Sequence, residues 1–197
     1  MSIGGWIILA VVVALAAWVI AIYNGLVTLR NRFKNAFAQI DVQLKRRYDL
    51  IPNLVEAAKG YLAHERQTLE AVIAARGAAV NASQRAAAAP GDPAAMTGLA
   101  QAEGVLGGAL GRLLAVFENY PDLKANQNVM QLQEELTTTE NQIGFSRQHY
   151  NATVREMNTA IQTFPNVLLA GALGFKERDY FQIEEADTAV PEVNLQI

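Results

Sequence analysis

The chain has 197 residues, a formal net charge of −3 and no cysteine. The lack of cysteine excludes disulfides, thiolate metal sites and cysteine nucleophiles. The weakly acidic charge argues against nucleic acid as a main ligand, because binding a phosphate backbone requires a basic surface. The length suits one domain with an appendage.

The amino-terminal segment predicts a membrane anchor, because residues 2–29 contain no charged side chain. Within it, residues 3–22 read IGGWIILAVVVALAAWVIAI. About 20 apolar residues, rising about 1.5 Å each, cross the roughly 30 Å of bilayer hydrocarbon. Trp6, Trp18 and Tyr23 lie towards the two ends, where amphipathic rings favour the membrane interface, although Trp18 sits about one turn inside. We therefore assign residues 1–29 to a transmembrane anchor.

A cleaved signal peptide is the alternative interpretation of this segment. Residues 14–16 supply an Ala-x-Ala pattern of the kind found at cleavage sites. Two observations favour an uncleaved anchor instead. The amino-terminal tail lacks Lys and Arg, and the apolar run continues to Leu29 rather than opening into a polar mature start.

Basic residues gather directly after the anchor and predict its orientation. They are Arg30, Arg32, Lys34, Lys45, Arg46 and Arg47. The positive-inside rule then places the amino terminus outside and the bulk of the chain in the cytoplasm. These residues also suit the solvated face of a helix, and the two interpretations are compatible.

The next segment is predicted to continue the anchor as a helix. Apolar residues recur in steps of three and four, or their sum, at Leu26, Leu29, Phe33, Phe37, Ile40, Leu44, Tyr48, Ile51, Leu54, Ala58, Leu62, Leu69, Ile73 and Val80. Pro52 is the one hard interruption, because it has no N–H and its ring crowds the carbonyl of Tyr48. It predicts a kink, tolerated at the surface, or a restart with Asp49 as the cap.

A hairpin tip is predicted at residues 77–93, which are rich in Ala, Gly and Pro, before a second helix over residues 94–118. This helix carries two overlapping Gly-x-x-x-Gly pairs, Gly104 with Gly108 and Gly107 with Gly111. Such spacing suits close packing of transmembrane helices. Because the segment also holds Gln101, Glu103 and Arg112, we expect close packing or flexibility within a bundle and not a second span.

A third helix is predicted from Pro121, which suits a first turn, to Phe164. Its stripe comprises Val129, Leu132, Leu136, Thr139, Ile143, Ser146 or Arg147, Tyr150, Val154, Met157, Ile161 and Phe164. At about 1.5 Å per residue this helix would be roughly 65 Å long. A short apolar piece, NVLLAGALGF, and the charged KERDYF follow it, and residues 184–197 form an acidic tail.

Several long motifs resemble one known family. They are YNGLVTLRNRFKNAFAQIDVQLKRRYDLIPNLVEAAKGYLAHE, YPDLKANQNVMQLQEELTTTENQIGFSRQHYN, VREMN and GFKERDYF. Nearly the whole chain is similar to the LemA family of bacterial single-span membrane proteins. The resemblance implies an inner-membrane protein with a short extracytoplasmic amino terminus and no settled activity. A related group helps to build magnetosome membranes, which points to membrane organisation.

Together these features predict an all-α fold in which a transmembrane helix continues into an elongated antiparallel bundle of about four helices. We assign residues 30–183 to the bundle and 184–197 to the tail. No catalytic constellation is visible. Neither His64 nor His149 follows a Glu by three residues, and His64 does not begin an HExxH motif. The glycine-rich segment lacks the Lys and Ser or Thr of a phosphate loop. We expect no metal, no cofactor and no enzymatic activity.

The polar middle of the third helix supplies the candidate functional residues. Those flanking its stripe are Glu140, Arg147 and Asn151, and the first helix offers partners that include Asp41 and Arg47. Buried polar groups are costly unless they are hydrogen-bonded. A network of these residues would fix helix register or oligomeric state. Alternatively, they form a polar groove for a peptide or another subunit.

The leading functional hypothesis is a noncatalytic, membrane-anchored scaffold that self-associates and organises membrane or recruits partners at the inner leaflet. Its expected partners are the lipid bilayer, further copies of the chain and unidentified proteins, but not nucleic acid. A second hypothesis is an adaptor or regulator of a membrane enzyme such as a protease. A third is a metal-dependent or small-molecule enzyme.

Overall fold

The computed structural model describes residues 2–62 and 64–183, so the predicted tail at 184–197 lies outside the described residues. Its elements are α1 (Ile3–Lys59), α2 (Arg66–Ala88), α3 (Pro93–Phe117), α4 (Pro121–Lys124), α5 (Gln127–Gln162) and a 3₁₀ turn, η1 (Asn166–Leu168). Within the described ranges no residue forms a strand. The all-α prediction is confirmed.

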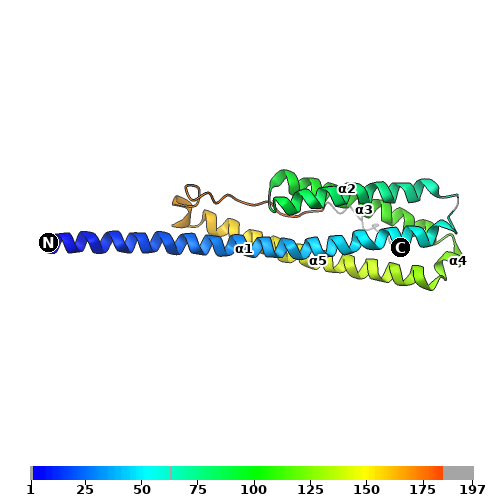
Figure 1. The fold of residues 1–197 in the computed structure, drawn as a ribbon, viewed down its shortest axis with the longest axis horizontal. Helices are drawn as coiled ribbons and strands as arrows, with labels where there is room; N and C mark the ends of the chain where they lie inside the picture. The colour runs from blue at the N-terminus through cyan, green and yellow to red at the C-terminus, as the bar shows by residue number, and fades with distance from the viewer. Residues whose placement is uncertain (1, 63, 184–197) are drawn as a thin grey trace, which may run out of the picture.

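The helices form an elongated bundle around α1 (Figure 1). α5 runs antiparallel beside α1, and the α2–α3 hairpin packs on α1 through α2. The predicted continuity of anchor and bundle is confirmed, because α1 is one helix of 57 residues. Its first part projects from the bundle and is almost wholly exposed, whereas from Leu26 onward it buries a residue in nearly every turn. Among the described helices, α1 has the length and apolar composition to cross a membrane.

Pro52 neither ends nor restarts α1, so the predicted restart at Asp49 is wrong. The helix continues to Lys59. Pro52 leaves the Tyr48 carbonyl without its helical donor, because residue i normally donates to residue i−4. Arg76 of α2 replaces that donor, and its Nε lies 2.6 Å from the Tyr48 oxygen. The packing of α2 therefore satisfies the group that proline orphans.

The chain first reverses between Lys59 and Arg66, a break that the periodicity did not predict. The apolar stripe consequently slips in α2, where Val72 is buried and Ile73 is half exposed. The predicted tip at 77–93 is also too wide, because the alanine-rich α2 remains helical to Ala88. The turn is confined to residues 89–92, with Gly91 at φ 77°. Asp92 then caps α3 by accepting from the Ala95 N–H at 3.0 Å.

The predicted third helix is divided into α4 and α5. Asn126 caps the start of α5, because its side-chain oxygen accepts from the N–H groups of Asn128 at 3.0 Å and Val129 at 3.3 Å. The buried positions of α5 are Val129, Leu136, Thr139, Ile143, Tyr150, Thr153, Val154, Met157, Asn158 and Ile161. Phe164 does not belong to this stripe, because it lies beyond the end of α5 and is 74% exposed.

After η1 the chain turns back towards the middle of the bundle as an extended segment, residues 175–183, which we call the strap. Phe175 and Phe181 of the strap are buried in the core. The Tyr150 hydroxyl donates to the Asp179 carbonyl at 3.0 Å, and the Asp179 N–H donates to the Gly91 carbonyl at 3.1 Å. The strap therefore joins α5 to the turn between α2 and α3.

Candidate functional site

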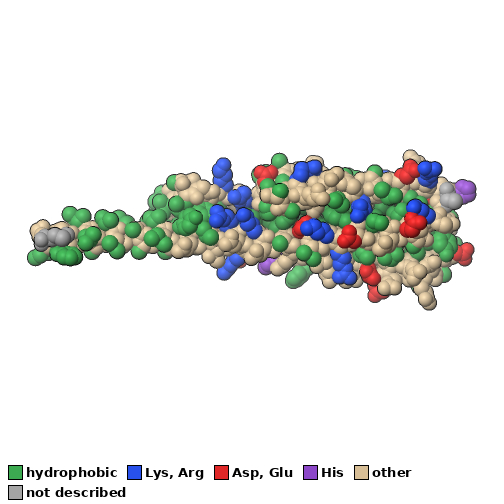
Figure 2. Space-filling view, viewed as in Figure 1, with side chains coloured by type: hydrophobic (Ala, Val, Ile, Leu, Met, Phe, Trp, Pro, Cys, Tyr) green, Lys and Arg blue, Asp and Glu red, His purple; other side chains and the backbone are tan. Residues whose placement is uncertain are grey.

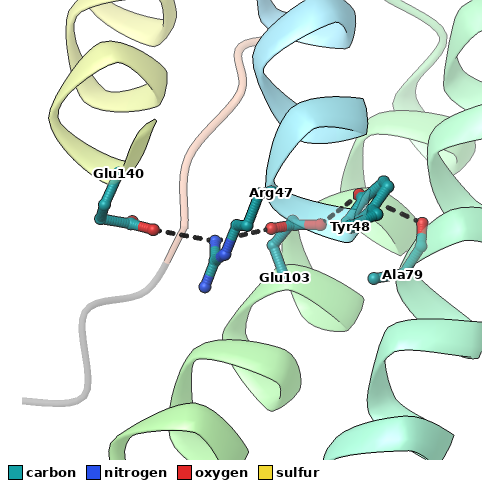
Figure 3. A network of polar contacts seen from close by, with 5 residues as sticks. All are labelled: Arg47, Tyr48, Ala79, Glu103 and Glu140. Atoms are coloured by element: carbon teal, nitrogen blue, oxygen red, sulfur yellow. Dashed lines mark hydrogen bonds and ion pairs between the residues drawn. The ribbon is translucent and has the colours of Figure 1, made fainter. Parts of the chain in front are cut away.

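A polar network in the middle of the bundle centres on Arg47, whose side chain is 5% exposed. Its Nη1 lies 3.0 Å from the Glu103 carboxylate of α3 and 3.0 Å from the Glu140 carboxylate of α5 (Figure 3). The Glu103 side chain is wholly buried, whereas that of Glu140 is 55% exposed. One guanidinium group thus connects three helices.

Tyr48, the next residue of α1, completes the network on the other side of Glu103. Its hydroxyl donates to the second oxygen of the Glu103 carboxylate and lies 3.4 Å from the Ala79 carbonyl of α2 (Figure 3). Burial raises the pKa of the Tyr48 hydroxyl, and the nearby Glu103 charge raises it further, so the phenol remains a proton donor. All four long helices therefore contribute to one set of contacts.

The protonation of Glu103 reflects two opposing effects. Burial raises the pKa of its carboxyl group, while the charge of Arg47 and the hydrogen bond from Tyr48 oppose that rise. Glu140 raises it further as a second negative charge. Arg47 is the group that most favours the charged form of Glu103 in the core.

Of the five predicted residues, Arg47 and Glu140 meet in this network. Asp41 lies elsewhere on α1, where it pairs with Lys45 at 2.6 Å and accepts a hydrogen bond from the Ser83 hydroxyl at 3.2 Å. Arg147 is half-buried on α5. The predicted residues therefore do not form a single cluster.

Asn151, which was predicted to pair with α1, instead hydrogen-bonds to the backbone of the strap. Its amide donates to the Phe181 carbonyl at 3.1 Å, and its side-chain oxygen accepts from the Phe181 N–H at 2.9 Å. Asn158 makes the same pair of bonds with Arg178, at 2.9 and 2.8 Å. Two asparagines on α5 thus replace the partners that a neighbouring β-strand would give the strap.

Sequence reasoning missed Glu103 and Tyr48 as members of the network. Tyr48 was assigned to the apolar stripe, and Glu103 served only as evidence against a second span. A signal existed for Glu103, because it occupies the stripe between Leu99 and Leu106, both buried. A lone acidic residue at a core position requires a buried basic partner.

Two of the three threonines in the polar middle of α5 are hydrogen-bonded within their own helix. The hydroxyl of Thr139, a buried residue, donates to the Glu135 carbonyl at 2.7 Å, and that of Thr137 donates to the Gln133 carbonyl at 2.9 Å. Such bonds to the preceding turn allow a hydroxyl to face a core without a partner on another helix.

A groove of about 590 Å³ lies beside the network, between α3 and α5. Arg47 and Glu140 of the network are among the polar residues that line it, together with Glu118 and Lys124. The α3 side contributes Gly107, Leu110, Gly111, Leu114 and Phe117, and the α5 side contributes Gln133, Leu136, Thr137 and Asn141. A surface of this kind suits an apolar side chain with a polar neighbour.

The network joins one phenol, two carboxylates and one guanidinium group. His64 and His149 are both exposed, one before α2 and the other on α5. Across residues 2–62 and 64–183, no group of three or more His, Asp or Glu side chains is arranged to hold a metal ion. What the arrangement can do is fix the relative register of four helices.

The fold and the apolar projection of α1 define a class: a membrane-associated helical protein with one candidate span among its described helices. The LemA family model matches residues 36–195. The chain therefore belongs to the LemA family.

The similar proteins include some that are named for magnetosomes. Magnetosome protein MamQ 2 of Paramagnetospirillum magneticum AMB-1 is 30% identical over 195 residues, covering 91% of this chain and 72% of that protein. Magnetosome protein MamQ of Magnetospirillum gryphiswaldense is 29% identical over 184 residues, covering 85% and 68%. Protein LemA of Metamycoplasma hominis is 26% identical over 164 residues, covering 83% and 70%.

Proposed function

We propose that this protein is a noncatalytic, membrane-anchored scaffold that self-associates and organises membrane or recruits partners at the cytoplasmic face of the inner membrane. The observation that carries the proposal is the continuity of α1. One helix supplies both the candidate span and a central element of the bundle core. A bundle attached in this way holds a fixed geometry relative to its anchor, which suits a structural role.

The orientation that we propose places the amino terminus outside. The first charged side chains after the apolar projection are Arg30, Arg32 and Lys34. The strap, which starts beside this part of α1, adds Lys176. Figure 2 shows Lys and Arg side chains gathered where the apolar rod joins the wider bundle. Positive charge on this flank favours its retention in the cytoplasm.

Relatives support a role at membranes. The similar proteins named for magnetosomes match 91% and 85% of this chain, so the shared region includes most of the bundle. The buried ionic network adds to this support, because such contacts favour one register over competing ones. A scaffold requires a single shape more than it requires a reaction site.

A second candidate, an adaptor for a membrane enzyme such as a protease, is favoured by the groove between α3 and α5. Native mass spectrometry from nanodiscs and crosslinking in intact cells separate the two candidates. The scaffold should appear as oligomers at cellular expression levels and should capture mainly itself. A monomer that crosslinks to a membrane enzyme in a fixed ratio would replace the scaffold with the adaptor.

A further inference from the structure

The segment between α5 and the strap, residues 163–174, lies at the end of the bundle from which α1 projects (Figure 1). We call it the apolar loop. Pro165 and Asn166 line one pocket of about 590 Å³ together with Trp18, Ile22 and other residues of α1. The Tyr23 ring packs edge-on against Phe175, with centroids 5.8 Å apart. The loop is thus held beside the last turns of the candidate span.

The loop exposes large apolar side chains at this position. Phe164 is 74% exposed, Leu168 67% and Val167 50%. The sequence from residue 157 to 175 contains no charged side chain, which makes it the second long uncharged stretch after residues 2–29. Contiguous exposed apolar groups in a folded protein mark an interaction surface.

Depth along α1 identifies the occupant of this surface. If residues 3–22 cross the hydrocarbon, Trp18 lies about 6 Å inside its edge, because four residues rise about 1.5 Å each. Pro165 and Asn166 share a pocket with α1 residues from Trp18 to Arg32, so the loop lies alongside the stretch in which the candidate span ends. A bilayer around the span would therefore meet the loop as well.

The charges around the loop suit an anionic lipid surface. The Arg30 guanidinium lies over the Phe175 ring, 5.4 Å from its centroid. Lys34, four residues after Arg30, and Lys176, next to Phe175, are both exposed. Two acidic groups at this end have partners: Glu156 pairs with Arg32 at 3.7 Å, and Glu177 accepts from Gln162 at 2.9 Å. Apolar groups ringed by Lys and Arg are typical of segments that lie in the headgroup region.

We propose that Phe164, Val167 and Leu168 insert into the headgroup–acyl boundary of the cytoplasmic leaflet, beside the anchor, as a second membrane contact that prefers anionic lipids. The proposal rests on the membrane anchoring and orientation proposed above. A second contact on one side of the span favours one direction of tilt of the bundle relative to the bilayer. It also widens the protein on one side at the membrane surface.

The experiment uses the full chain in phosphatidylcholine–phosphatidylglycerol vesicles, with an NBD dye on a single cysteine, since the chain has none of its own. The labelled variants are Val12→Cys in the span, Leu168→Cys in the loop and Phe145→Cys, at a 75% exposed position of α5. Nitroxide lipids should remove emission at positions 12 and 168 but not at 145. Iodide in the buffer should give the reverse pattern.

A matched pair of variants tests the contact itself. Phe164→Ser should reduce the lipid quenching of the dye at 168, whereas Phe145→Ser, which removes an equally exposed phenylalanine, should not. Replacing phosphatidylglycerol by phosphatidylcholine should reduce quenching at 168 and leave position 12 unchanged.

Three outcomes overturn the proposal. If nitroxide lipids quench the dye at position 12 while iodide quenches the dye at position 168, the loop contact is refuted and the anchoring proposal stands. A dye at 168 that neither nitroxide lipid nor iodide quenches is covered by protein, which indicates a second copy and not lipid. Loss of lipid quenching at both 12 and 168 refutes the anchoring proposal on which the loop contact rests.

Discussion

Arg47 carries its charge in a core position, and this determines what substitutions there should do. Removing one partner of a buried pair costs about 3 to 5 kcal/mol, because the remaining charge loses both water and its partner. Replacing both by apolar groups is often close to neutral. Glu140 differs, because its side chain is 55% exposed and water can replace its contact with Arg47.

We predict that Arg47→Met lowers the free energy of unfolding by about 3 to 5 kcal/mol, and that the double variant Arg47→Met with Glu103→Leu recovers much of the loss. Glu140→Gln should cost less than about 1 kcal/mol. Denaturant unfolding of the full chain in detergent, followed by circular dichroism, measures all three. Equal losses for Glu140→Gln and Arg47→Met would contradict the assignment of the buried pair.

A pH dependence follows from Glu103. Burial raises its pKa in the folded state above the ordinary value for Glu, and removing Arg47 eliminates the main effect that opposes the rise. A group whose folded pKa is raised gives its full stability below the unfolded pKa and loses it as pH rises through the folded pKa. The cost of Arg47→Met should therefore be smaller near pH 5 than near pH 8. Unfolding midpoints across this range, with Glu103→Gln added as the uncharged control, measure the difference.

At the scale of the element, Pro52 and Arg76 act as a unit. The proline orphans the Tyr48 carbonyl, and Arg76 reaches it from α2. We predict that Arg76→Met costs about 1 to 3 kcal/mol in the native background, because a partly buried acceptor is left unsatisfied. In a Pro52→Ala background the new N–H of residue 52 can donate to the Tyr48 carbonyl, so Arg76→Met should cost less free energy of unfolding. Arg85→Met, at an exposed position of the same helix, is the control, and additive effects in the double-mutant cycle would refute the coupling.

The strap is matched to α5 by length. Asn151 and Asn158 are seven residues apart, a rise of about 10 Å, and their partners Arg178 and Phe181 are three extended residues apart, also about 10 Å. Both asparagines therefore engage the strap in one register. Asn151→Ala should raise hydrogen exchange at residues 178–181 and leave the middle of α1 protected. Gln148→Ala, at an exposed position of α5, is the control, and unchanged exchange in the strap would contradict its attachment through Asn151.

Elements set by local periodicity were predictable, and contacts between distant elements were not. The stripes of α1 and α5 recur over many turns, so their existence and type follow from the sequence. The end of α1 at Lys59 was not predicted, because Gly60 is the only strong helix-breaking residue near it. The pairing of Asn151 with Phe181 leaves no trace in either segment, since it uses backbone atoms of an extended chain. Arg47 was selected as a polar residue near the stripe, but its partner Glu103 required the α2–α3 hairpin to be placed.

For the whole molecule, the proposed orientation can be tested with two cysteines. Ser2→Cys lies at the tip of α1, and Gln84→Cys is exposed on α2, unlike the neighbouring Ser83, which is buried. An impermeant thiol reagent added to spheroplasts should label residue 2 and spare residue 84 until the membrane is permeabilised. Labelling of residue 84 alone in intact spheroplasts would reverse the topology.

The single helix α1 also acts as a lever arm. From Leu26 to Lys59 it extends about 50 Å beyond the candidate span, at about 1.5 Å per residue. Transmembrane helices tilt by about 20° on average, and they tilt more where the bilayer is thinner. Such a tilt, pivoting at the membrane surface, would move the far tip of the bundle sideways by about 17 Å. The thickness of the surrounding bilayer would thereby be converted into the spacing between the far ends of neighbouring molecules.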